Sequence, residues 1–157
     1  MIQKLAQFEK VMLAQLRSPA ITTATAKRVL KRTSCQFVLD YGWFYTPSPL
    51  PKKVKPGTPN ECYRNALELV LHDPSLIYVE GYASGAGGLP IRHAWVTDGH
   101  GRAIDNTCGE LNFVYAGVPF VTRFVSGIPT WPTPHECLSL LPTPTITPYF
   151  QNARTVI

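Results

Sequence analysis

The chain has 157 residues, of which 45% are hydrophobic and 16% are charged. This length fits a single domain that can build a core, and the composition excludes a wholly disordered protein. Every long apolar window is interrupted by a charged residue or a proline before it reaches the ~18–20 residues of a membrane span. The N-terminal residues lack the continuous apolar run of a secretory signal, so we expect a cytoplasmic protein without membrane contact.

Fifteen Lys and Arg residues against ten Asp and Glu residues give a net charge of +5. Basic residues cluster at 27–32 and 52–55, but no RNA-binding signature or helix-turn-helix pattern lies beside them. We therefore expect these runs to be solvated faces, and nucleic acid to be an unlikely partner. The oligomeric state is left open.

The four cysteines are spaced too widely to form a C-x-x-C pair. Without a secretory signal they are expected to be free thiols. A zinc site remains an alternative, but the spacing of its candidate ligands does not suit tetrahedral zinc, and we predict neither a metal nor an organic cofactor. Those candidate ligands are Cys62, His93, His100 and Cys108.

The first 57 residues predict two helices, one strand and a connection. Apolar residues recur at helical spacing over residues 1–18, and a second, basic helix is indicated over residues 21–33. Residues 35–45 are aromatic and β-branched, which favours a strand. Residues 46–59 contain five prolines, so we expect an irregular connection there.

The segment 58–125 is the predicted core of the domain. Residues 58–61, Thr-Pro-Asn-Glu, have the form of a capping box, and the helix that they would open should end before Pro74. Four strand-like runs follow, separated by glycine-rich turns. These runs cover residues 76–83, 91–97, 102–107 and part of 113–125. Residues 126–157 are rich in proline and predict an extended arm, so the whole chain, 1–157, is expected to be one domain.

Cys62 lies near the start of the predicted helix. Unpaired backbone N–H groups at a helix N-terminus stabilise anions, so this position favours the thiolate form and could also hold an oxyanion. The alternative is structural, since Cys62 also begins an apolar stripe with Ala66, Leu69 and Val70.

His93 and Asp105 lie on two successive predicted strands joined by a glycine turn. They share a face if the strand register pairs them directly, or if the register is displaced by two residues. A carboxylate that orients an imidazole, which in turn takes a thiol proton, is the chemistry of nucleophilic catalysis. Taken singly, each residue is better explained by a structural role.

Four short segments together resemble the transglutaminase-like branch of the papain-like cysteine enzymes. They are CYRNA at 62–66, YVEGYA at 78–83, HAWV at 93–96 and IDNT at 104–107. The resemblance implies an α+β fold in which a Cys-bearing helix packs on an antiparallel sheet, here with N-terminal helices added. It implies that Cys62 is the nucleophile, His93 the general base and acid, and Asp105 the residue that orients His93.

The same resemblance places Trp95 and Tyr82 beside the site, where they would line or support it. The oxyanion glutamine of papain is not evident before Cys62, and Asn60 is the candidate to contribute an amide instead. The predicted function is amide or ester hydrolysis, or acyl transfer, through a thioester on Cys62. The substrate would be a protein, a peptide or a small acyl compound. The alternative is a non-catalytic binding or adaptor protein that uses its basic surface.

Overall fold

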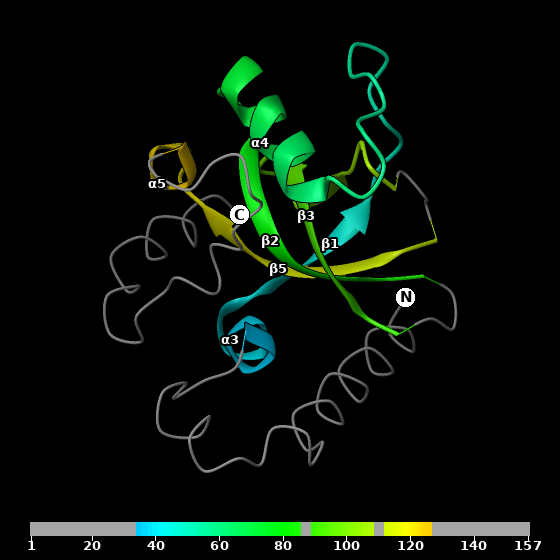
Figure 1. The fold of residues 1–157 in the computed structure, drawn as a ribbon. Helices are drawn as coiled ribbons and strands as arrows, with labels where there is room; N and C mark the ends of the chain where they lie inside the picture. Colours follow the sequence, from blue (N-terminus) through cyan, green and yellow to red (C-terminus); the bar gives the residue numbers. More distant parts are fainter. Residues whose placement is uncertain (1–33, 86–88, 109–111, 127–157) are drawn as a thin grey trace.

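The computed structural model describes residues 34–85, 89–108 and 112–126 (Figure 1). The helices predicted over 1–18 and 21–33 lie outside the described residues, as does the C-terminal arm beyond Ser126. In chain order the elements are α3 (Ser34–Tyr41), β1 (Trp43–Pro47), α4 (Cys62–His72), β2 (Ile77–Ser84), β3 (Ile91–Thr97), β4 (Arg102–Ile104), β5 (Val114–Phe120) and α5 (Thr122–Ser126). No helix within these described ranges is long and apolar enough to cross a membrane.

The five strands form a closed barrel in the order β1-β4-β3-β2-β5. The expected papain-like α+β fold, with a Cys-bearing helix packed on an antiparallel sheet, is therefore wrong, and the architecture is mostly β. The cause is β1, which pairs in parallel with β4 and antiparallel with β5 and so joins the two edges of the sheet. The other four strands pair antiparallel throughout, and α4 packs against β3 and β2.

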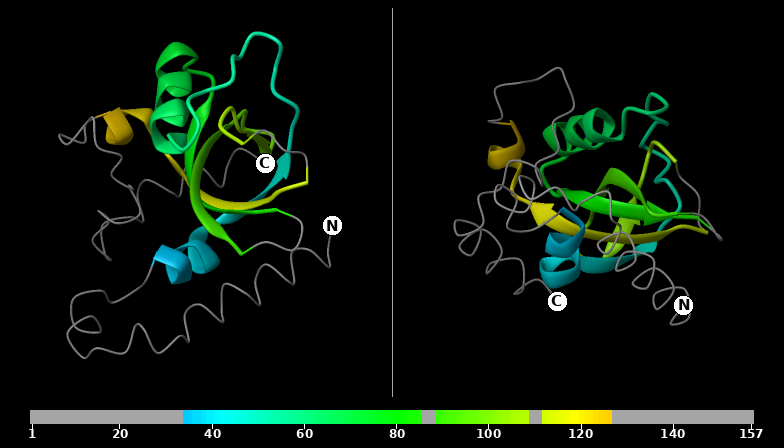
Figure 2. Two further views of the ribbon diagram at one scale, coloured as in Figure 1. Left: turned by 45° about the vertical axis from the view of Figure 1, so that its right-hand side comes forward. Right: turned by 60° about the horizontal axis from the view of Figure 1, so that its bottom comes forward.

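Alternation along the strands sorts the side chains into two clusters. The inner cluster fills the barrel and consists of Tyr45, Val79, Ala83, Trp95, Ala103 and Tyr115. The outer cluster includes Ala94 and Val96 of β3 and the apolar face of α4. The helices lie along the outside of the barrel (Figure 2). Neighbouring residues of β3 therefore point in opposite directions, one set toward α4 and the other into the barrel.

Residues 35–45 were predicted to form one strand, but they form α3, a break at Gly42 and then β1. The Phe37 and Tyr41 rings contact each other across one helical turn, at 4.9 Å between centroids. The N–H of Gly42 closes the helix on Val38 O at 2.7 Å. A side chain at Gly42 would place Cβ only 2.4 Å from that oxygen, so the chain turns into β1 at a glycine.

The predicted capping box does not form. α4 begins at Cys62, and its N-cap residue, Glu61, makes no side-chain capping hydrogen bond. The Glu61 carboxylate instead accepts a hydrogen bond from Arg64 at 2.9 Å, and Asn60 takes a left-handed conformation with φ 64°. The helix does end before Pro74, as predicted. The predicted irregular connection is also present, as the segment between the end of β1 and the start of α4.

Gly117 lies where the barrel interior has no room for a side chain. It lies opposite Gly81 of β2, and a Cβ at Gly117 would come within 2.6 Å of both Glu80 O and Trp95 Cη2. We predict that Gly117→Ala lowers the free energy of unfolding by about 1–3 kcal/mol, because a backbone oxygen and a packed indole must both shift. Urea denaturation measures the change. Gly85→Ala, whose Cβ would meet Phe113 at an ordinary 3.5 Å, is the control and should be nearly neutral.

Candidate active site

His93 and Asp105 form a buried hydrogen-bonded pair, with 2.7 Å between Nε2 and Oδ2. Their exposed fractions are only 2% and 3%. The strand register pairs Val96 with Ile104 and Thr97 with Ala103, so His93 is displaced by two residues from the position directly opposite Asp105. This is the second of the two registers that the sequence allowed, and it brings both side chains to the inner face.

Asp105 is held by four hydrogen bonds. Its Oδ1 accepts from the backbone N–H of Thr107 at 2.8 Å and of Cys108 at 3.1 Å. Its Oδ2 accepts from His93 and from the Tyr115 hydroxyl, the latter at 3.0 Å. Burial alone would raise the pKa of this carboxyl, but the hydrogen bonds and the charge of His93 lower it. Asp105 is therefore an anion with a fixed orientation.

Cys62 is the first residue of α4 and is 9% exposed. Burial lowers the pKa of His93, but hydrogen bonds from the imidazole to Asp105 and to Cys62, together with their charges, raise that pKa to about 9. The thiol thus lies beside the imidazole. Because Nε2 is bound to Asp105, the second ring nitrogen, Nδ1, is the atom left to exchange a proton with Cys62.

Trp95 supports the site from inside the barrel. Its ring stacks on His93 with 6.3 Å between centroids and an interplanar angle of 19°. At 1% exposure Trp95 is a packing partner of His93 and does not face a substrate. Tyr82 was expected to line or support the site as well. Gly81 of β2 pairs with His93 and shares its inner face, so the next residue, Tyr82, points to the other face and belongs to the outer cluster. Asn60 is exposed in the turn before Cys62.

Two further residues of the site, Tyr115 and Asn65, were not found from the sequence. Tyr115 comes from β5 and reaches Asp105 across the barrel interior. Asn65 is buried on α4, where its side chain bonds Thr58 and Thr107. The sequence did contain an indication for Asn65, because it is a polar residue on the apolar side of the predicted helix, three residues after Cys62. A polar side chain buried there needs hydrogen-bond partners.

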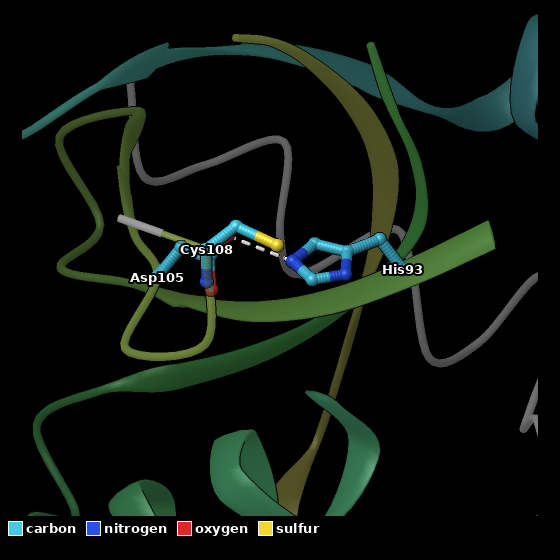
Figure 3. Close-up of side chains that lie close together, drawn as sticks. All are labelled: His93, Asp105 and Cys108. Carbon is cyan, nitrogen blue, oxygen red and sulfur yellow. Dashed lines mark hydrogen bonds and ion pairs between the residues drawn. The ribbon is translucent and has the colours of Figure 1, made fainter. Parts of the chain in front are cut away.

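Cys108 also lies close to the pair. The side-chain donor atoms of His93, Asp105 and Cys108 all lie within 4.8 Å of one another, which is a combination that could hold a metal ion. Figure 3 shows Nε2 of His93 facing Asp105 beside the Cys108 sulfur, while the other ring nitrogen points away. Both carboxylate oxygens already accept two hydrogen bonds each, so this geometry favours an oriented imidazole over a metal centre.

Comparison with protein-family models, with curated proteins and with solved structures finds no match for this chain. The argument about its function therefore rests on the geometry of the site.

The raised pKa of His93 gives a prediction for the wild-type protein and for Asp105→Asn. We expect the imidazole NMR signals of wild-type His93 to titrate near pH 9. In Asp105→Asn the carboxylate charge is gone, while burial still lowers the pKa of His93 and Cys62 still raises it, so the midpoint should fall clearly below that of the wild type. A wild-type midpoint near ~6.5 would contradict the strong pairing of His93 with Asp105 and Cys62.

The same shift fixes the direction of the pH dependence of stability. A histidine whose pKa rises from ~6.5 to about 9 on folding stabilises the protein fully below pH ~6.5, and this contribution is lost as the pH rises through about 9. It amounts to at most about 3 kcal/mol. Urea denaturation between pH ~6.5 and ~10 should show this loss in the wild type, and Asp105→Asn should show a smaller loss.

Proposed function

We propose that this protein catalyses acyl chemistry on an amide or ester through a thioester on Cys62. The observation that carries the proposal is the joining of Cys62, His93 and Asp105 in one buried network, with the cysteine at a helix N-terminus. The order Cys, His, Asp matches the transglutaminase-like resemblance of the sequence. The closed barrel departs from that family's fold, so the proposal is based on the site and not on the architecture.

In the first step the Cys62 thiolate attacks the carbonyl carbon, which forms a C–S bond and an oxyanion. When the oxyanion collapses, the bond to the leaving group breaks, and the leaving group takes a proton from the His93 imidazolium. A thioester on Cys62 remains. In the second step water or an amine attacks the thioester, His93 accepts its proton, and the C–S bond breaks to restore the thiolate and the imidazolium.

The start of α4 supplies a source of oxyanion stabilisation. Asn65 donates its backbone N–H to Glu61 O at 2.9 Å, which is a helical bond to the fourth preceding residue. The backbone N–H groups of residues 62–64 precede this hydrogen bond in the chain. Like the first N–H groups of any helix, they point out of its N-terminal end. They suit an oxyanion that forms beside Cys62. This source replaces the amide that was expected from Asn60.

The substrate in this proposal is a protein, a peptide or a small acyl compound in the cytoplasm. Water as the second reactant makes the enzyme a hydrolase, and an amine makes it a transferase. The bond chemistry at Cys62 is identical in both cases.

The proposal predicts that 4-nitrophenyl acetate acetylates the wild-type protein on Cys62. Cys62→Ser should reduce the rate of nitrophenolate release at least about a thousand-fold, because one histidine activates a hydroxyl poorly. Asp105→Asn should be milder, since an amide still holds the ring but does not stabilise the imidazolium. Mass spectrometry of the intact chain and of its peptides identifies the acetylated residue.

Cys108→Ser is the matched control, since Cys108 lies near the same pair but has no role in the proposed steps. It should keep the wild-type rate, and the melting temperature of Cys62→Ser should change little. Full activity in Cys62→Ser would overturn the proposal. A Cys62→Ser protein destabilised by about 1–3 kcal/mol, with no acetylation of the wild type, would instead support a structural cysteine in a binding protein.

A further inference from the structure

The buried side-chain amide of Asn65 joins two loops that flank the site. Asn65 lies one turn after Cys62 on α4 and is 3% exposed. Its Oδ1 accepts the Thr58 backbone N–H at 3.1 Å, and its Nδ2 donates to Thr58 O and to Thr107 Oγ1, both at 2.8 Å. The amide therefore makes three of the four hydrogen bonds available to it, all of them outside its own helix.

The Thr107 end of this connection leads directly to Asp105. The Thr107 backbone N–H donates to Asp105 Oδ1 at 2.8 Å. A second bond runs beside it, from the Gly57 N–H to Asn106 O at 2.7 Å. Gly57 is packed so closely on Asn65 that a Cβ there would lie 2.4 Å from the Asn65 Cγ. Residues 57–58 and 106–107 are thus joined at two neighbouring points.

Apart from the hydrogen bonds of Asn65, α4 is held against the barrel by apolar packing. Its other buried residues after the first turn are Ala66, Leu67 and Val70, which belong to the outer cluster with Ala94 and Val96 of β3. Apolar packing is not directional, so it resists a small slide of the helix along the barrel less than hydrogen bonds of fixed length and angle.

We propose that Asn65 is a positioning residue, which holds the start of α4, and with it Cys62, at the correct place beside the loop that carries Asp105. The inference rests on the function proposed above. The connections form a closed circuit: Cys62 contacts His93, His93 bonds Asp105, Asp105 bonds the Thr107 backbone, and the Thr107 side chain bonds Asn65 on the helix that begins with Cys62. Opening the circuit at Thr107 leaves every group of the proposed chemistry present but lets Cys62 move relative to His93.

The test is Thr107→Val, which removes the hydroxyl but keeps the shape of the side chain and the backbone N–H that binds Asp105. The measured quantity is the rate of Cys62 alkylation by iodoacetamide at pH ~6, with free glutathione in the same sample as the internal reference. We expect Thr107→Val to slow alkylation of Cys62 about ten- to a hundred-fold, the cost of misplacing reacting groups by about 1 Å. Thr107→Ser, which restores the hydroxyl, should return the wild-type rate.

The pH profile, together with a measurement of folding, separates positioning from loss of structure. At pH ~6 a thiolate depends on a paired imidazolium, whereas a free cysteine ionises unaided near ~8.5. The deficit of Thr107→Val should therefore shrink as the pH rises above ~9. An unfolded cysteine would converge in the same way, so the melting temperature and the circular dichroism spectrum of Thr107→Val, which should stay close to those of the wild type, separate misplacement of Cys62 from unfolding. Thr107→Ala, which removes the same hydroxyl and adds no charge, should behave like Thr107→Val and replaces it if the valine variant does not fold.

Two results would contradict these proposals, and they are distinct. If wild-type Cys62 is alkylated faster than glutathione at pH ~6 and both variants keep that rate, Asn65 is not a positioning residue and the proposed function stands. If wild-type Cys62 is no more reactive than glutathione at that pH, the proposed function fails first, and the inference about Asn65 fails with it.

Discussion

The hydrogen bond between His93 and Asp105 is the interaction on which the rest of the site depends. Both groups are almost completely buried, and an unpaired charge there would be strongly unfavourable. The backbone N–H groups of Thr107 and Cys108 and the hydroxyl of Tyr115 stabilise the carboxylate. The carboxylate in turn keeps the imidazole protonated and oriented. A charged imidazole beside a cysteine is then an arrangement that stabilises a thiolate.

The barrel explains how such a pair is kept away from water. Closure by β1 creates an interior filled by Tyr45, Trp95 and Tyr115, and Gly117 leaves room for the indole. His93 stacks on this aromatic core, and Tyr115 serves both as packing and as a hydrogen-bond donor. Cys62 comes from outside the barrel, on α4. The site is thus formed where the end of a surface helix meets a group that belongs to the barrel interior.

Local sequence patterns predicted part of this arrangement. Alternation along β3 placed His93 with Trp95, the bounds of β3 agree with the prediction, and Pro74 marked the end of α4. Closure of the barrel was not predictable in the same way, because it depends on β1 pairing with strands that lie more than 50 residues away in the sequence. Residues 35–41 have strand-forming side chains, yet packing of α3 against β5 and β2 makes them helical. Asn65 and Tyr115 acquire their roles only through partners distant in the sequence.

The central claim is that Cys62 and His93 form a reactive pair in the folded protein, and a crystal structure at neutral pH tests it most directly. The account predicts that the Cys62 sulfur lies within ~4 Å of His93 Nδ1, with Asp105 bound to Nε2 on the other side of the ring. A sulfur turned into the apolar contact between α4 and β3, more than ~8 Å from the imidazole, would contradict it.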